Sequence, residues 1–444
     1  MSNTTVGFVS LGCAKNRVDA EMMMYSLRKG GYVLKDDPAV CDVAIINTCG
    51  FIESAKQESI NEILELAELK KEGKIKAIVV TGCLSERYKE EMMKEIPEID
   101  SAIGIGANGD ICEVIDSVLK GDKVSSFPDK MLLPLEGGRV QSTEAHWAYL
   151  KVADGCDNCC TYCAIPLIRG RFRSRKMENI IEEAKALVSN GVKELNVIAQ
   201  DTTRYGEDLY GKLMLPALLR ELCRIDGIEW IRVLYCYPDR ITDELLDTIR
   251  KEEKIVKYID LPLQHCSEDI LRKMNRRGSY QELSSLIKKI REKIPGVVLR
   301  TTLITGFPTE TDEQFQELSR FVNETRFERL GCFAYSQEED TPAALMDGQV
   351  DEDVKLHRAE LITEQEAYIM SDFCEAQIGS VIDVLTDGFD RYAECFFGRS
   401  PFDAPEVDPC VFFTAERKPQ KGEMVKVRIT DILDCDLVGE MVEE

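Results

Sequence analysis

Three cysteines lie within eight residues of one another near the middle of the chain. In the segment GCDNCCTYC, Cys156, Cys160 and Cys163 follow a C-x3-C-x2-C spacing. Three thiolates so close together can bind one face of a 4Fe–4S cube, and one iron then stays open to a small chelating molecule. Cys159 permits a zinc interpretation with two abutting C-x2-C pairs, but such pairs normally need about 12–20 intervening residues. Inert thiols are the other alternative.

Three more cysteines follow predicted strands in the first part of the chain. Cys13, Cys49 and Cys83 end the segments SLGC, INTCG and VTGC. The carboxyl ends of neighbouring parallel strands share one edge of a sheet, so these thiols are expected to converge there and hold a second cluster. The alternative is three small buried apolar residues, which is a common role of cysteine.

Composition limits the environment and the partners. The chain has 444 residues, with 17 Cys but only 3 His, and a formal net charge of −24. We expect a cytoplasmic protein without disulfides, because no apolar run reaches the roughly 20 residues of a membrane span and no signal peptide is evident. So acidic a chain suits a basic partner better than the phosphates of a nucleic acid.

The elements that must position the first three thiols alternate short apolar strands with helices. We predict a domain over residues 1–125 with an open parallel α/β sheet. Its strands are expected at 6–11, 42–48, 77–82 and 101–105, and its helices at 19–31, 58–73, 86–96 and 110–121. Residues 121–145 are rich in Gly, Pro, Ser and charge and are predicted to be a linker.

A second domain, expected over residues 140–375, repeats a strand-then-helix pattern six times. The repeats predict a partial TIM-like (βα)6 barrel, with a doubly wound sheet as the alternative. Its strands are expected at 148–153, 194–199, 231–236, 258–263, 298–304 and 329–335. Residues 376–444 then change to short alternating strands, which predict a small antiparallel β-barrel. This last segment has 15 acidic and 7 basic residues.

The cysteine loop after the first barrel strand resembles that of the radical S-adenosylmethionine superfamily, including the aromatic Tyr162 before the last Cys. The resemblance implies that the open iron binds the amino and carboxylate groups of S-adenosylmethionine, whose reductive cleavage gives methionine and a 5′-deoxyadenosyl radical. It further implies that Tyr162 lies near the adenine. The strand residues Gln200, Asp201, Arg300 and Thr302 are expected to contact the other groups of the cofactor.

The resemblance extends over nearly the whole chain to the methylthiotransferases, with a TRAM-like domain at the end. The motifs are typical of the branch that modifies an aspartate of ribosomal protein uS12. Departures at Ala14, Thr309 and the SQEED segment remove no cluster ligand. The motifs that carry this resemblance are SLGCAKNRVDAE, INTCGFIESAKQESI, IAQDTTRYG, CYPDRITDELL, LPLQHCSEDILRKMNRRG and GRSPFDAPEVD.

The resemblance therefore implies an enzyme with two 4Fe–4S clusters that methylthiolates the β-carbon of an aspartate. That carbon has no acidity for a side-chain base to exploit, so the cofactors do the chemistry and no acid–base residue is assigned. The expected partners are uS12 or the small ribosomal subunit, a reductant of the flavodoxin or ferredoxin type, and a sulfur donor. The alternatives are methylthiolation of N6-isopentenyladenosine in transfer RNA and a non-catalytic iron–sulfur carrier.

Overall fold

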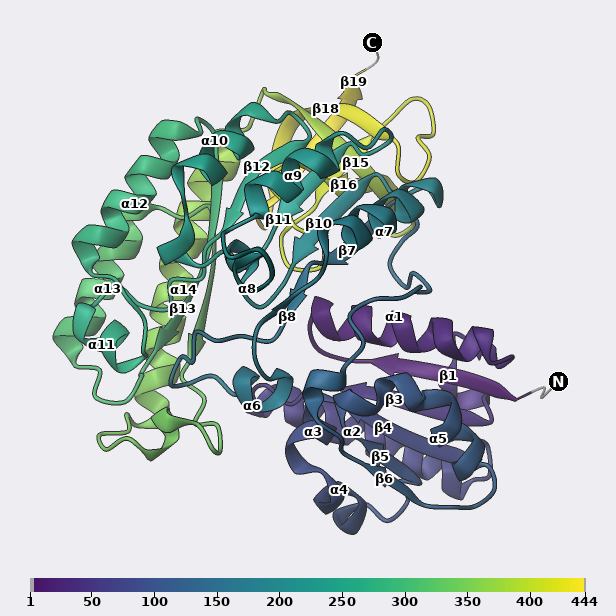
Figure 1. The fold of residues 1–444 in the computed structure, drawn as a ribbon. Helices are drawn as coiled ribbons and strands as arrows, with labels where there is room; N and C mark the ends of the chain where they lie inside the picture. Colours follow the sequence, from purple (N-terminus) through teal and green to yellow (C-terminus); the bar gives the residue numbers. More distant parts are fainter. Residues whose placement is uncertain (1–3, 443–444) are drawn as a thin grey trace.

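The computed structural model describes residues 4–442 and contains three packed units (Figure 1). The first unit is a six-stranded parallel sheet in the order β2-β1-β3-β4-β5-β6. This order reverses at β1, so the sheet is doubly wound. Ligands bind such sheets at the carboxyl ends of the strands, where the strand order reverses. The strands are β1 (Thr5–Ser10), β2 (Val33–Lys35), β3 (Val43–Thr48), β4 (Ala77–Gly82), β5 (Ser101–Ile103) and β6 (Val124–Ser126).

Helices cover both faces of this sheet. One apolar core lies under α1 (Ala14–Lys29) and α5 (Ile111–Val118), and a second lies under α2 (Glu53–Lys71). Several details differ from the sequence prediction. Strand β2 was not predicted, and α1 and α2 each begin five residues earlier than expected. The expected helix over 86–96 is broken at Lys89, whose φ is 48°, into α3 (Cys83–Tyr88) and α4 (Glu90–Glu95). The expected linker also supplies β6, the edge strand of the sheet.

The second unit is a half-barrel of six parallel strands in the order β14-β13-β12-β11-β10-β7. The order never reverses, so the chain winds in one direction, as in a TIM barrel; the doubly wound alternative is therefore wrong. All six strands overlap their predicted segments, although β12 begins and ends three residues earlier than expected. Their bounds are β7 (Trp147–Lys151), β10 (Glu194–Ile198), β11 (Trp230–Val233), β12 (Ile255–Asp260), β13 (Val298–Thr305) and β14 (Arg329–Ala334).

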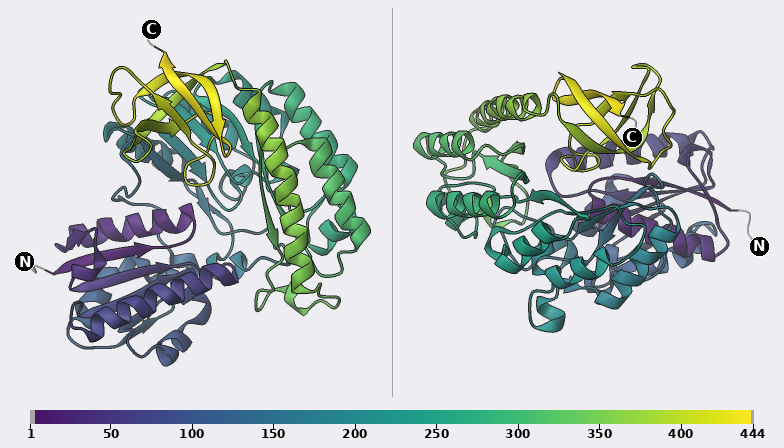
Figure 2. Two further views of the ribbon diagram at one scale, coloured as in Figure 1. Left: turned by 180° about the vertical axis from the view of Figure 1, so that it is seen from behind. Right: turned by 90° about the horizontal axis from the view of Figure 1, so that it is seen from above.

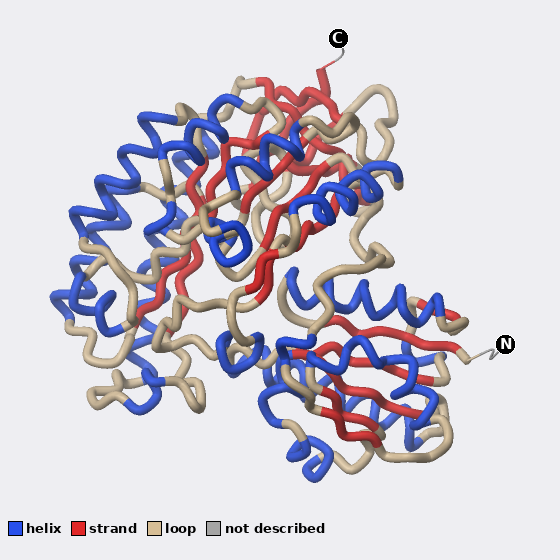
Figure 3. The backbone as a smooth tube through the Cα atoms, viewed as in Figure 1, coloured by secondary structure: helices blue, strands red, loops and turns tan. Residues whose placement is uncertain are grey.

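Helices line the outside of the half-barrel (Figure 3). The helix before the terminal unit, α14 (Glu352–Glu375), was not predicted. Its buried positions include Lys355, Arg358 and Glu366, so it has no continuous apolar stripe that a periodicity argument could detect. The remaining helices of eight or more residues here are α7 (Met177–Ser189), α9 (Leu215–Cys223), α10 (Asp243–Lys251), α12 (Tyr280–Lys293) and α13 (Asp312–Thr325).

The third unit is a closed five-stranded barrel in the order β15-β16-β17-β19-β18. The prediction of an antiparallel barrel holds for four neighbouring pairs, but β17 and β19 run parallel. A closed ring with an odd number of strands cannot alternate direction at every step, so one parallel pair is required. The strands are β15 (Val381–Asp390), β16 (Cys395–Arg399), β17 (Val411–Thr414), β18 (Met424–Leu433) and β19 (Asp436–Val442).

The terminal barrel packs against the inner, strand-lined face of the half-barrel, opposite its outer helices (Figure 2). Residues 400–408, between β16 and β17, form a segment that we call the plug loop. Its Ala404 and Phe402 join one apolar cluster with Trp147 and Trp230 of the half-barrel and Val18 of α1. The plug loop therefore covers the half-barrel interior near the amino-terminal ends of its strands, where Trp147 and Trp230 lie.

Two global features complete the fold. No helix within residues 4–442 is long and apolar enough to span a bilayer. All 17 cysteines lie in this described range, and every one is a free thiol.

Candidate functional site

The three strand-end thiols of the first unit converge. Cys13 is the N-cap of α1, Cys49 follows β3, and Cys83 begins α3. A Cβ atom added at Gly12, whose φ is +85°, would lie 2.9 Å from the Cys49 sulfur, and one added at Gly50 would lie 3.0 Å from the Cys83 carbonyl carbon. The turns touch each other so closely that only glycine fits at these positions.

The electrostatics of these thiols favour a positively charged ligand. Burial raises the pKa of Cys13, but the cations of Lys15 and Arg169 and backbone N–H groups outweigh it, so the pKa lies below the usual value. Burial raises the pKa of Cys49, and it raises the pKa of Cys83 to about 12 with help from the two neighbouring thiols. Three mutually close thiols of this kind become thiolates together when a metal cluster supplies positive charge.

The compact set lies in a loop after the two-residue strand β8 (Ala153–Asp154), held by backbone contacts to two other segments. The Cys156 N–H donates to the Gly170 carbonyl over 3.1 Å, and the Thr161 N–H donates to the Met274 carbonyl over 3.1 Å. A Cβ atom added at Gly155 would lie 2.1 Å from a backbone oxygen, so the loop needs glycine there. The loop is thereby fixed in position by the fold.

The thiols of this compact set are half-buried and lie close enough to affect one another electrostatically. Burial raises the pKa of Cys156 to about 12, and the nearby Cys160 adds to the shift; the pKa of Cys163 is raised for the same reasons. The Arg276 guanidinium donates to the Cys160 sulfur over 3.7 Å. Within residues 4–442 no three His, Cys, Asp or Glu side chains are placed to hold a single metal ion. Each set fits an iron–sulfur cluster by its soft donors, their number and their convergence.

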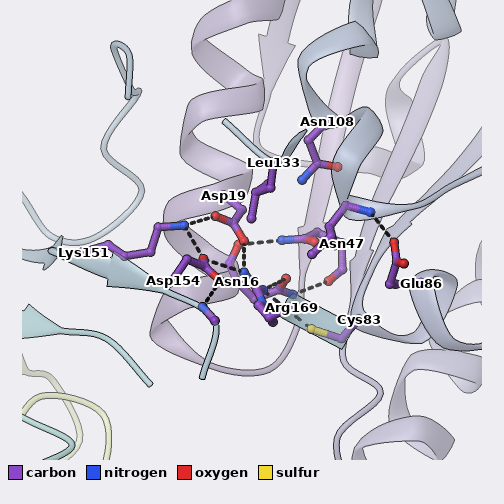
Figure 4. A network of polar contacts seen from close by, with 12 residues as sticks. Asn16, Asp19, Asn47, Cys83, Glu86, Asn108, Leu133, Lys151, Asp154 and Arg169 are labelled. Carbon is purple, nitrogen blue, oxygen red and sulfur yellow. Dashed lines mark hydrogen bonds and ion pairs between the residues drawn. The ribbon is translucent and has the colours of Figure 1, made fainter. Parts of the chain in front are cut away.

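A buried charge network joins the two sets (Figure 4). Arg169, at the end of α6 (Ile165–Arg169), donates to the Cys83 sulfur over 3.6 Å and lies 2.5 Å from Asp19 of α1 and 3.1 Å from Asp154. Lys151 of β7 pairs with the same two carboxylates. Because Asp154 is two residues before Cys156, this network fixes one set of thiols relative to the other.

The predicted cofactor residues Tyr162, Gln200 and Asp201 surround the compact set. Tyr162 packs with a small apolar cluster that includes Met274 and Phe307. Asp201 accepts from Asn158 of the cysteine loop over 2.8 Å and supports that loop. The buried Oε1 of Gln200 has no protein partner. Gln200 is therefore the member of these three with a free polar atom for a ligand.

The other two predicted cofactor residues lie on β13. Residues 300, 302 and 304 alternate with fully buried ones, so Arg300 and Thr302 face the half-barrel interior. Arg300 is near the start of the strand rather than at its carboxyl end. Its guanidinium lies 3.2 Å from Asp260 and 3.7 Å from Asp408 of the plug loop.

The structure also brings in residues that sequence reasoning did not select. Lys15 reaches from α1 to the half-barrel, where its Nζ lies 3.2 Å from the centroid of the Tyr235 ring. Arg17, two positions further on α1, pairs with Glu406 of the plug loop over 2.8 Å. Glu406 also accepts from the Tyr149 hydroxyl over 2.9 Å. Lys15, Arg17 and Glu406 lie within the quoted motifs, but the motifs gave no indication of their partners in space.

Three protein-family models match the chain, one for each unit. Residues 5–104 match an uncharacterised family, UPF0004; residues 150–322 match the radical SAM superfamily; and residues 378–442 match the TRAM domain. The matches agree with the doubly wound sheet, the half-barrel and the terminal barrel in order and extent.

Close relatives match over almost their full length. The chain is 49% identical over 433 residues to the ribosomal protein uS12 methylthiotransferase RimO of Lachnoclostridium phytofermentans, covering 97% of this chain and 98% of that one. It is 50% identical to RimO of Caldanaerobacter subterraneus, covering 98% and 99%. The solved radical S-adenosylmethionine methyltransferase TsrM of Kitasatospora setae has a TM-score of 0.61 at 13% identity, covering 78% and 77%, which indicates a shared fold.

Proposed function

This chain belongs to the RimO family of ribosomal protein uS12 methylthiotransferases, and from this membership we propose that it transfers a methylthio group to the β-carbon of an aspartate in uS12. It is a radical SAM enzyme, and its cofactors are iron–sulfur clusters and S-adenosylmethionine. The observation that carries the proposal is the pair of three-thiol sets joined through Arg169.

We propose two 4Fe–4S clusters for each chain. Cys156, Cys160 and Cys163 would hold the cluster that supplies reductive cleavage of S-adenosylmethionine, and the strand-end set Cys13, Cys49 and Cys83 would hold the cluster that carries sulfur. Each set supplies three soft donors, and a buried guanidinium donates to one sulfur of each set. Such donors offset thiolate charge and fix the ligand geometry.

The half-barrel interior would receive S-adenosylmethionine. Tyr162 packs on an apolar cluster and lies next to Cys160 of the compact set, and Gln200 has a buried acceptor without a protein partner. Thr302 faces the same interior from β13. Asp201 and Arg300 are already engaged by protein groups, so we propose that they orient the pocket as well as line it.

The functional units we propose are residues 1–125 for the sulfur-carrying cluster, 140–375 for radical generation and 376–444 for substrate recognition. The terminal segment has a net charge of −8, from 15 acidic and 7 basic residues. Its sign favours a basic ribosomal protein, free or in the small subunit, over transfer RNA. A low-potential reductant of the flavodoxin or ferredoxin type and a sulfur donor complete the reaction.

Mass spectrometry of uS12 tests the proposal. Anaerobically reconstituted enzyme should contain about eight irons per chain on the ligand count, and with reductant it should add a methylthio group to one aspartate of uS12. Replacing Cys156, Cys160 and Cys163 by Ala should remove about half of the iron and all 5′-deoxyadenosine. Replacing the strand-end cysteines should leave 5′-deoxyadenosine formation and abolish the product. Modification of transfer RNA with uS12 left unmodified contradicts the proposal.

A further inference from the structure

Lys15 is a buried cation without an acidic partner. Its side chain belongs to a residue that is 6% exposed, and no carboxylate of the described residues forms an ion pair with it. The other three buried lysines of residues 4–442 each have at least one carboxylate partner. These are Lys56, Lys151 and Lys355. Burying an unpaired ammonium group costs several kcal/mol, so a ligand that brings a carboxylate is favoured at this position.

Lys15 lies at the junction between the strand-end thiols and the half-barrel. It is two residues after Cys13, in the first turn of α1, and its Nζ lies over the Tyr235 ring just beyond β11 of the half-barrel. The neighbouring cation Arg17 is already neutralised by Glu406 of the plug loop. Arg169, the buried cation nearest to Cys83, has two carboxylates. Lys15 is thus the cation at this junction that lacks a carboxylate partner; its anionic neighbour is the Cys13 thiol.

We propose that the Lys15 ammonium binds the side-chain carboxylate of the substrate aspartate and selects aspartate for modification. The inference rests on the proposed function and names the residue that recognises the substrate. In aspartate the reacting β-carbon is bonded directly to the carboxylate carbon, so holding the carboxylate fixes the reacting carbon one bond away. A charge-assisted hydrogen bond of this kind is strong in a site screened from water.

The same geometry gives a basis for discrimination. An asparagine at the substrate position offers no negative charge, and a glutamate places its γ-carbon where the β-carbon of aspartate would lie. An adenosine base has no carboxylate to neutralise Lys15. The competing explanation is that Lys15 only offsets the charge of the cluster thiolates, since it is a charge neighbour of Cys13.

Peptide binding to the reconstituted holoenzyme separates these explanations. The probes are fluorescent peptides of the uS12 segment around the modified aspartate, with Asp, Asn or Glu at that position. We expect wild-type enzyme to bind the Asp peptide roughly tenfold or more tightly than the Asn peptide, the range for a buried charged hydrogen bond. Lys15→Met should bind both peptides alike, and Lys15→Arg should keep a preference for Asp. Lys29→Met, a change of an exposed lysine of the same helix, is the matched control.

Iron content and the electron paramagnetic resonance spectra of the reduced clusters are the second readout. The proposal expects Lys15→Met to retain both clusters. An unchanged Asp preference in Lys15→Met overturns it. So does loss of iron from both Lys15→Met and Lys15→Gln with none from Lys29→Met, because Lys15 would then act on the cluster alone. If wild-type enzyme modifies no uS12 at all, the proposed function fails instead.

Discussion

Asp19 is the carboxylate that the first unit contributes to the buried charge network, and Asp19→Asn should loosen the contact between that unit and the half-barrel. The network contains Asp19 and Asp154 against Lys151 and Arg169, each at most 1% exposed, so its formal charge is zero (Figure 4). The substitution leaves two buried cations with one carboxylate. Breaking a buried pair from one side costs about 3–5 kcal/mol.

Urea unfolding and limited proteolysis within residues 121–145 measure the effect. With an m-value of about 3 kcal/mol per molar or less, the transition that releases the first unit should fall by at least roughly 1 M in urea. Asp243→Asn is the matched control, since Asp243 also contacts two lysines, at 2.9 and 2.6 Å, but its side chain is 63% exposed. That exposed change should leave the transition where it is.

A second substitution refines the test. Adding Lys151→Met to Asp19→Asn leaves Asp154 and Arg169 as one neutral pair, so the double variant should regain part of the lost stability. The reasoning is refuted if Asp19→Asn unfolds at the same urea concentration as Asp243→Asn. It is also refuted if Lys151→Met, added to Asp19→Asn, lowers the free energy of unfolding further instead of raising it.

Further predictions concern a turn, a helix and the plug loop. Gly12→Ala should lose about half of the bound iron and keep 5′-deoxyadenosine formation, because the new Cβ meets Cys49. Gly31→Ala is the control and should keep all of its iron, since Gly31 has a similar φ of +88° but open space around it. Burial raises the pKa of Glu366 to about 7 from the usual 4.5, so the folded state binds more protons than the unfolded state. The free energy of unfolding should therefore fall by up to about 3 kcal/mol as pH rises from about 4.5 to about 7. Glu366→Gln should flatten this pH dependence in thermal unfolding. Truncation after residue 375 should give an aggregating protein in size-exclusion chromatography, because it uncovers the cluster around Trp147 and Trp230; a monomer that still forms 5′-deoxyadenosine contradicts the account of the plug loop.

The parts of the fold that follow local patterns could be read from the sequence. Five of the six half-barrel strands are mostly buried, and each strand overlaps the segment that the pattern predicted. The order of those strands, which distinguishes a half-barrel from a doubly wound sheet, depends on long-range pairing and has no local signature. Helix α14 was missed for a different reason: its buried face includes Arg358, which pairs with Glu310 and Asp312, and Glu366, which lies near Arg329, so its charged positions find partners only after folding.

The site divides in the same way. The positions of Cys13, Cys49 and Cys83 after predicted strands indicated that they converge, since the geometry of a parallel sheet brings strand ends to one edge. The contacts of Lys15 and Arg17 could not be predicted, because their partners come from other units of the chain. Arg300 shows the limit of a strand-end rule, because its place near the start of β13 directs it to the plug loop.

The plug loop also sets the point during translation at which the half-barrel interior can be covered. The last half-barrel strand, β14, ends at Ala334, yet the loop that fills the interior ends at residue 408, more than seventy residues later. At about 5–20 residues per second, a ribosome needs roughly 4–15 seconds to make that stretch. During that interval the apolar interior of the nascent half-barrel is uncovered, and it is open to chaperones while the cysteine loop is already outside the exit tunnel. The surface around Trp147 and Trp230 is therefore covered only when the end of the chain has been made.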